Sequence, residues 1–281
     1  MPGKYEVLAP AGCLEDVKLM ISEKADAIYV GLQGFSSRPQ KADFYLNDIK
    51  EAVYLCHKSD VKLYVAINVN VAQSDIERLK KEILVLDDYQ VDAVILSEFG
   101  LIADLQGKLQ HAKVHASTLL GVYNIETVRL LRKLGVTRII FYANLYIDEM
   151  AAIINAVPDL EYELVAEGGT CFNDIRQCKL PHGFENGEHI LFCRKGFELQ
   201  SCDNTSCHAK PISEHPTRTA EIVGIYMAMG ITSFKIEGRT VDGRLRVPMV
   251  RDLLSNIERF SMGMPLKSYL HYFSRTNREM R

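Results

Sequence analysis

The sequence contains no long apolar run, no apolar leader and no excess of basic residues. No apolar stretch approaches the roughly 20 residues that cross a bilayer, and residues 1–6 do not resemble a signal peptide. We therefore expect a cytoplasmic protein without membrane insertion. The formal net charge of -3 disfavours a broad nucleic-acid surface, because binding phosphates requires concentrated lysine and arginine. The net charge thus does not favour RNA as a binding partner.

Three familiar motifs are also absent. The chain has no clear glycine-rich turn for binding a dinucleotide. It lacks three cysteines spaced three and two residues apart, the arrangement often found in radical enzymes that use S-adenosylmethionine. No Ser–His–Asp or Cys–His arrangement is evident that would support peptide hydrolysis.

The segments that are present alternate between short apolar runs and amphipathic stretches. Continuous apolar runs are typical of parallel strands buried on both faces. Strands are expected at 6–9, 27–31, 62–68, 93–96, 114–116, 138–142, 160–165 and 233–236, and helices at 14–24, 47–57, 75–89, 125–134, 147–157 and 220–229. Asn47 and Ser74 are expected to begin helices, and Gly135 to end one.

Eight strands with intervening helices predict an α/β fold of the TIM-like (βα)8 barrel type. The length of 281 residues suits one such domain, which commonly needs about 250 residues. A doubly wound open sheet is the alternative. We expect residues 1–281 to form a single barrel domain.

Residues 168–216 interrupt this alternation and contain five of the seven cysteines, Cys171, Cys178, Cys193, Cys202 and Cys207. They follow the seventh expected strand, on the side where barrel loops carry function. In a reducing compartment, clustered cysteines indicate metal ligands or catalytic thiols before disulfides. Four cysteines are the usual complement of a 4Fe–4S cluster. The segment is interpreted as a cluster-binding insertion in the barrel.

Zinc is the alternative metal. Structural zinc sites usually contain cysteine pairs two to four residues apart, and only Cys202 and Cys207 approach that spacing. The longer, irregular spacings suit a cluster better, since a cluster is wider than one ion. Cys13 and Cys56 lie in or near expected helices and are interpreted as structural.

Several segments carry a family resemblance by their order and spacing. They are Leu-Ala-Pro-Ala-Gly at 8–12, Asp-Ala-Ile-Tyr-Val-Gly at 26–31, Phe-Ser-Ser-Arg at 35–38, Val-His-Ala-Ser-Thr at 114–118, Arg-Gln-Cys at 176–178 and Ser-Phe-Lys-Ile-Glu-Gly-Arg at 233–239. Over nearly its whole length the chain resembles the collagenase-like peptidase family. That family includes subunits U and V of anaerobic ubiquinone hydroxylation and the anaerobic RNA hydroxylation proteins.

The resemblance implies a barrel-like fold, a 4Fe–4S cluster on four cysteines, and oxygen-independent hydroxylation of a quinone precursor or RNA. Carried over to this sequence, Cys171, Cys178 and Cys193 match three ligands. Cys207 is the fourth, with Cys202 as its alternative. The short chain also resembles members that pair with a homologous subunit, so a hetero-oligomer is expected.

The last expected strand ends in three charged residues at alternate positions, Lys235, Glu237 and Arg239. Period-two geometry points them to one side, where two cations flanking a carboxylate can hold a carboxylated ligand. The alternative is an ion-pair network that stabilises the rim of the barrel. These residues, with His115, are the catalytic candidates.

Other polar residues are candidates for binding a small anionic or aromatic substrate. His115, Ser117 and Thr118 end the fifth expected strand, although they could instead cap the following turn. Arg38, after the second strand, is a candidate anion clamp. Tyr29, Tyr64 and Tyr142 are expected mainly to pack in the core, with stacking on an aromatic ring as the alternative.

Three functions follow from these expectations. The first is an iron–sulfur enzyme, or enzyme subunit, for oxygen-independent hydroxylation. The second is a peptidase whose activity does not depend on the clustered cysteines. The third is a non-catalytic partner subunit that binds zinc or a cluster.

Overall fold

The structure is a computed structural model that describes residues 5–37, 42–141, 145–170, 222–239 and 242–263, and the short strands 182–185, 188–191, 197–200, 206–209 and 215–218. For the short strands and for 169–170 it describes the backbone alone. Arg38, Tyr142 and four of the five clustered cysteines lie outside the described residues, as does the side chain of Cys207.

Eight parallel strands pair side by side and close into a barrel. In ring order they are β1 (Glu6–Pro10), β2 (Ala27–Leu32), β4 (Lys62–Ile67), β5 (Ala93–Leu96), β6 (Lys113–Ala116), β7 (Val136–Ile140), β8 (Glu161–Thr170) and β14 (Ser233–Ile236). Because β1 pairs with both β2 and β14, the ring is closed and the open-sheet alternative is excluded. The predicted TIM-like (βα)8 architecture is confirmed. A short strand, β3 (Asp43–Phe44), adds to the end of β2.

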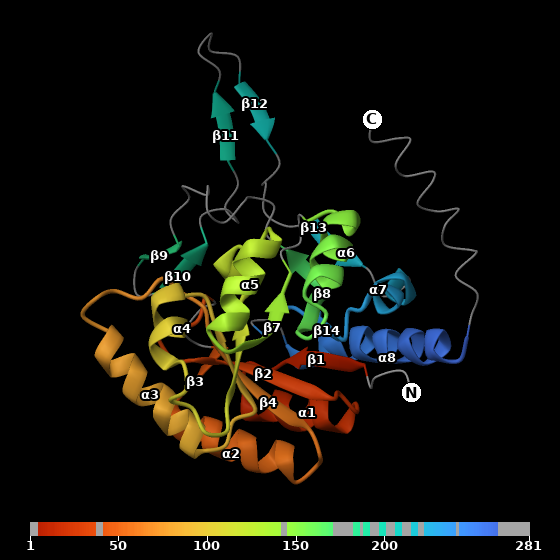
Figure 1. Cartoon of the computed structure of the whole chain (residues 1–281). Helices are drawn as coiled ribbons and strands as arrows, with labels where there is room; N and C mark the ends of the chain where they lie inside the picture. The colour runs from red at the N-terminus through yellow and green to blue at the C-terminus, as the bar shows by residue number, and fades with distance from the viewer. Residues whose placement is uncertain are drawn as a thin grey trace.

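Helices follow most of the barrel strands and lie outside the ring (Figure 1). They are α1 (Leu14–Ser22), α2 (Leu46–His57), α3 (Ile76–Asp88), α4 (Phe99–Leu105), α5 (Ile125–Lys133), α6 (Ile147–Ala156), α7 (Val223–Met229) and α8 (Val247–Ser261). Among the described helices, none combines the length and apolar character needed to cross a membrane. The sequence pattern did not predict α4 or α8.

Two helices, α2 and α3, do not begin at the residues expected from the sequence. The residue preceding α2 is Tyr45, whose backbone N–H donates to the Asp48 carboxylate at 3.2 Å, so Asn47 already lies inside the helix. The residue preceding α3 is Asp75 rather than Ser74. The expected stop at Gly135 is confirmed, because its φ of 86° follows the last turn of α5.

Residues 168–216 contain more regular structure than the sequence indicated. β9 (His182–Glu185) pairs with β10 (Glu188–Leu191), and β11 (Phe197–Gln200) pairs with β12 (Ser206–Ala209), both antiparallel. β8 continues five residues beyond the expected end at Val165, and β13 (His215–Arg218) pairs antiparallel with this extension. Figure 1 draws the two hairpins outside the ring of helices.

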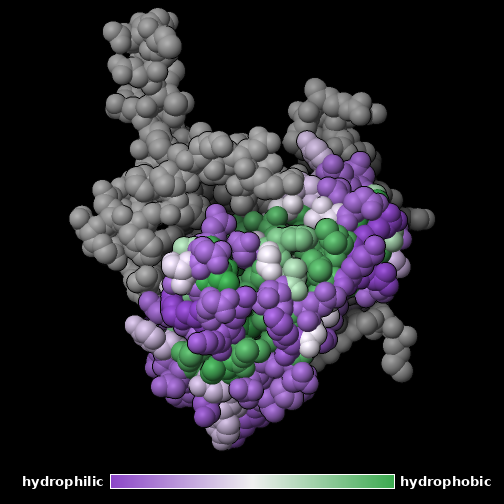
Figure 2. Space-filling view, turned by 60° about the vertical axis from the view of Figure 1, so that its left-hand side comes forward, coloured by the Kyte–Doolittle hydropathy of each residue, from purple (hydrophilic) through white to green (hydrophobic). Residues whose placement is uncertain are grey.

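Some charged side chains on the described outer surface form ion pairs with near neighbours in the sequence. On the face shown in Figure 2, hydrophilic side chains predominate and apolar side chains form patches between them. Arg78 lies 3.1 Å from Glu82 on α3, and Lys108 lies 3.1 Å from Asp104 at α4. Exposed pairs of this kind add little stability. They do neutralise basic side chains that could otherwise bind an extended polyanion.

The inside of the barrel is partly charged. Arg138 on β7 is 3% exposed and donates to Glu6 Oε1 at 2.6 Å, to Glu163 Oε2 at 3.1 Å and to Ser233 Oγ at 3.1 Å. Ser233 in turn donates to Glu6 Oε1 at 3.0 Å. One guanidinium thus connects four barrel strands, β1, β7, β8 and β14. Removing one partner would leave a buried charge unpaired, which typically costs about 3–5 kcal/mol.

The Glu6 carboxylate has further partners besides Arg138 and Ser233. Tyr64 donates to Glu6 Oε2 at 2.7 Å, and Lys62 approaches the same oxygen at 2.9 Å. Burial alone would raise the pKa of Glu6, but attraction to Arg138 and Lys62 outweighs burial and lowers the pKa from 4.5 to about 2. The ionised form of Glu6 is therefore more stable in the folded protein than in the unfolded chain.

Glu6→Gln is expected to lower the free energy of unfolding by about 3 kcal/mol at neutral pH. A lowered pKa gives stability that is present above the ordinary value of 4.5 and is lost as the pH falls toward 2. The difference between wild type and variant should therefore shrink below about pH 4.5. Urea unfolding at a series of pH values measures it.

Glu126→Gln is the matched control, because Glu126 is 78% exposed and, within the described ranges, pairs with Arg129 on the same helix. It should leave the unfolding free energy nearly unchanged at every pH. A Glu6→Gln difference that stays constant from neutral to acidic pH would contradict the assigned role of the carboxylate.

Candidate functional site

The carboxyl end of β14 lies where barrel enzymes place their sites. Arg239, three residues beyond this strand, is 4% exposed and reaches across the end of β2. Its guanidinium donates to Asp43 Oδ1 at 3.3 Å and to Ser36 Oγ. Arg239, one of the catalytic candidates, is therefore paired with a buried carboxylate of the chain itself.

Two motif glycines make room for Arg239. An ideal Cβ on Gly31 would lie 1.8 Å from Arg239 Nη1 and 2.2 Å from Asp43 Oδ1. A Cβ on Gly12 would lie 2.2 Å from the Arg239 carbonyl oxygen. Three segments that are far apart in the sequence, ending at Gly12, Gly31 and Arg239, therefore meet at one point of the rim.

Asp43 is a member of this cluster that sequence reasoning did not select. Burial raises its pKa to about 6, although Arg239 and Ser36 favour the ionised form. Its second oxygen, Oδ2, is buried and has no hydrogen-bond partner among the described residues. Asp43 lies on β3, shortly before α2, and outside the motif segments given above.

Lys235 lies deeper inside the barrel than Arg239. Its ammonium nitrogen is 4.0 Å from the centre of the Tyr29 ring and 3.6 Å from Glu163 Oε1. Arg239 approaches the same ring, with Cζ 5.6 Å from its centre. The two cations thus lie over the same tyrosine ring, whereas the alternation predicted only that they point to one side together with Glu237. Tyr29 and Tyr64 are buried inside the barrel, which confirms their expected packing role.

Glu237 joins the ends of β14 and β8. Its backbone N–H donates to the Glu167 carbonyl at 2.8 Å, and its side chain is half-buried. Gly168 has a φ of 118°, and a Cβ there would lie 2.8 Å from Glu237 Cβ. A side chain at 168 is therefore disfavoured both by the backbone and by space.

The expected trio on β6 does not meet at one point. His115 is 1% exposed and stacks edge-on against Tyr64, 4.9 Å between ring centres. Burial and the charge of Arg138 lower its pKa, so the imidazole is neutral at pH 7. Ser117 accepts from Leu119 N–H and so caps the next turn, the alternative given above. Thr118 donates to the Phe141 carbonyl at 3.3 Å.

The cysteine segment is anchored at this same end of the barrel. Thr170 on β8 pairs with His215 on β13, so the residues that flank 171–214 are adjacent. Cys207 lies on β12 opposite Leu199. In the part of the chain that the structure describes, no group of three metal-ligating side chains occurs. The ligand assignments for Cys171, Cys178, Cys193, Cys202 and Cys207 therefore stay predictions.

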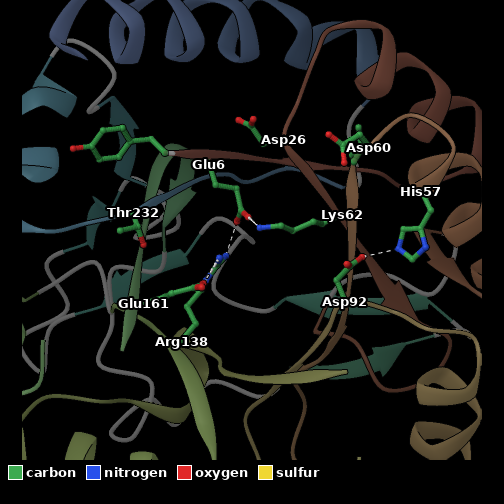
Figure 3. A pocket seen from close by; sticks show the side chains of 11 residues that line it. Glu6, Asp26, His57, Asp60, Lys62, Asp92, Arg138, Glu161 and Thr232 are labelled. Atoms are coloured by element: carbon green, nitrogen blue, oxygen red, sulfur yellow. Dashed lines mark hydrogen bonds and ion pairs between the residues drawn. The ribbon is translucent and has the colours of Figure 1, made fainter. Parts of the chain in front are cut away.

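A cavity of about 400 Å³ opens at the opposite, amino-terminal end of the strands. Figure 3 shows acids and bases facing one another across it. Arg138 donates to Glu161 Oε2 at 2.6 Å, and His57 lies 3.0 Å from Asp92. Because these charges pair within the wall, we interpret this end as structural.

A family model, peptidase family U32, matches residues 12–260. The chain belongs to peptidase family U32. It is 32% identical to tRNA hydroxylation protein P of Helicobacter pylori over 84% of this chain and 60% of that protein. It is 29% identical to a 23S rRNA 5-hydroxycytidine synthase of Escherichia coli over 85% of this chain and 37% of that protein. The chain therefore spans about 40–60% of these relatives.

The barrel also matches a solved family U32 structure. The alignment with that U32 peptidase has a TM-score of 0.58 and covers 85% of this chain and 95% of the other. Sequence identity is only 12%, so this likeness supports the fold alone.

The family name raises the question of a peptidase site. Among the described residues, Cys56 is the thiol nearest in sequence to a His–Asp pair, since it precedes His57 and interacts with Asp92. Burial, assisted by Asp92, raises the pKa of Cys56 to about 12. An activated cysteine nucleophile requires the opposite shift. Cys13 is exposed at the start of α1, but partial burial raises the pKa of its thiol as well.

Gly31→Ala is expected to lower the unfolding free energy by about 1–3 kcal/mol, because the new methyl group displaces the Arg239 guanidinium. Gly100→Ala, an exposed helical position with no atom closer than 3.9 Å, is the matched control and should change little. Urea unfolding compares them. Equal stability of the two variants would show that Arg239 does not need the space at Gly31.

Proposed function

We propose that this chain is the barrel of an iron–sulfur-dependent enzyme that hydroxylates bases in RNA without molecular oxygen. The 32% identity to a tRNA hydroxylation protein over 84% of the chain carries the proposal. The second relative is named for making hydroxycytidine in ribosomal RNA, which agrees with the same class of reaction. A quinone precursor is the second candidate substrate, and it rests on the resemblance of the sequence to the ubiquinone-pathway subunits.

The proposed cofactor is a 4Fe–4S cluster on Cys171, Cys178, Cys193 and Cys207, with Cys202 as the alternative fourth ligand. The donor set fits, because thiolates are soft ligands that suit iron–sulfur clusters. The pairing of Thr170 with His215 holds both ends of this segment at the carboxyl end of the barrel. A bound cluster supplies one-electron transfer.

The described residues would then form the floor beneath the cluster segment. Lys235, Glu237 and Arg239 lie at the end of β14, and Glu237 connects directly to the β8 extension that leads to Cys171. Arg239 is occupied by Asp43, so its role in this scheme is to shape the rim. His115 is neutral and buried, which suits packing better than proton transfer.

We also propose that the protein is cytoplasmic and works with a homologous subunit. The local pairing of surface charges, as at Arg78 and Lys108, does not favour wide RNA binding by this chain. Contacts with RNA are therefore expected near the carboxyl mouth, over a small area.

The test begins with protein purified without oxygen. We expect about four irons and four sulfides per chain, and their loss in a Cys171→Ala, Cys178→Ala double variant. Cys13→Ala is the matched control and should retain the cluster, since Cys13 lies at the start of α1. One zinc and no sulfide would contradict the cluster.

The hydroxylation itself is measured by nucleoside mass spectrometry of RNA from cells that contain or lack the gene. We expect one nucleoside heavier by one oxygen atom, present after growth without oxygen and absent with the double cysteine variant. An unchanged nucleoside profile with a changed quinone profile would favour the quinone precursor instead.

A further inference from the structure

Arg246 is a partly buried arginine at the carboxyl end of the barrel. It is the last residue of the short 3-10 helix η5 (Gly243–Arg246), which follows β14 and leads directly into α8. Its guanidinium lies against the backbone of Gly238, because an ideal Cβ there would be 2.0 Å from Arg246 Nη2 and 2.2 Å from Cζ. Gly238 also has a φ of 128°, which favours glycine. A glycine at 238 thus makes the space that the guanidinium occupies.

The partners of Arg246 distinguish it from the two buried arginines of the described barrel. Arg138 and Arg239 each pair with carboxylates. In the part of the chain that the structure describes, Arg246 forms no ion pair, and its one hydrogen bond runs from Nη1 to the Met249 sulfur at 3.4 Å. Thioether sulfur is a weak acceptor. Arg246 Nε is buried and has no hydrogen-bond partner there.

A guanidinium in this state lacks both a counter-charge and an oxygen acceptor. A buried donor without an acceptor destabilises the folded protein, and arginine does not lose its proton to avoid the cost. An oxyanion supplies the negative charge and the acceptor atoms together. The planar guanidinium matches the oxygens of a phosphate group particularly well.

The position of Arg246 agrees with such a ligand. Phosphate sites in (βα)8 barrels commonly lie between the loops after the seventh and eighth strands, beside a short extra helix. In this chain these strands are β8 and β14, and η5 is the short helix. The segments beyond the two strands meet beside Gly238, because a Cβ on Gly168 would lie 2.8 Å from Glu237 Cβ.

We infer that Arg246, held against Gly238, binds one phosphate group at the carboxyl mouth of the barrel. Arg244, two residues earlier, is 86% exposed and lies 3.8 Å from Asp242, so a second cation stands at the edge of this site. A phosphodiester of an RNA backbone is the source that fits the small contact area expected at this mouth. The RNA source rests on the proposed function, whereas binding of a phosphate group does not.

Inorganic phosphate tests the site in the full-length protein. The midpoint of thermal unfolding should rise and saturate as phosphate replaces chloride at constant ionic strength, and Arg246→Met should lose this saturable rise. Arg251→Met is the matched control and should keep it, since Arg251 lies on α8 and already pairs with Glu23 at 2.6 Å. Phosphate also stabilises proteins by exclusion from their surface. A rise that does not saturate and is equal in all three proteins would therefore overturn the inference.

An unmodified tRNA transcript tests the source of the phosphate. Arg246→Met should weaken binding about tenfold and reduce the slope of log affinity against log salt by about 0.7–0.9, the effect of one lost phosphate contact. Arg246→Lys keeps the charge without the planar fork and should lie between wild type and Arg246→Met. Arg251→Met should bind as wild type does. Unchanged tRNA binding with a lost phosphate effect would overturn RNA as the source and indicate a phosphorylated small molecule.

Stability separates a ligand site from a structural role. Urea unfolding of Arg246→Met without phosphate should give a free energy equal to or above that of wild type, because the variant removes an unpaired charge. A clear loss of stability would show that the arginine is retained for the fold and would overturn the inference. None of these measurements depends on iron content or on hydroxylated nucleosides, so failure of this inference and failure of the proposed function are distinguishable.

Discussion

The guanidinium of Arg138 holds four strands of the barrel through one set of hydrogen bonds. It contacts Glu6, Glu163 and Ser233, which come from strands at the start, middle and end of the chain. Such a contact set forms only when the ring is closed, because β1 must lie beside β14. The rest of the interior depends on it, since Tyr64 and Lys62 orient toward the same Glu6 carboxylate.

Charge in a barrel interior is costly unless every member is paired. The amino-terminal half meets this condition with short hydrogen bonds around Arg138. Pairing is incomplete at two interior carboxylates, because Glu163 Oε1 and Asp43 Oδ2 lack hydrogen-bond partners among the described residues. Incompletely satisfied polar groups are more common at functional positions than in purely structural ones.

The fold could be predicted because buried parallel strands are continuous apolar runs. Ala93–Leu96 and Ser233–Ile236 match their predicted bounds. The extension of β8 to Thr170 could not be predicted, since it depends on pairing with a strand some fifty residues away. The role of Asp43 could not be predicted for the same reason, since its partner Arg239 is 196 residues away in the sequence. The alternation of Lys235 and Arg239 can be read from the sequence because it is a local property, whereas their shared contact with the Tyr29 ring cannot.

The pairing of β13 with the end of β8 also has a consequence for evolution. It closes residues 171–214 at their base, so the barrel already fixes the distance between their two ends. Loop-closure entropy rises slowly with length, by about 0.6 kcal/mol for each doubling. Insertions or deletions within this segment therefore place little strain on the strands below. The β8–β13 ladder is thus the attachment through which the barrel carries this segment.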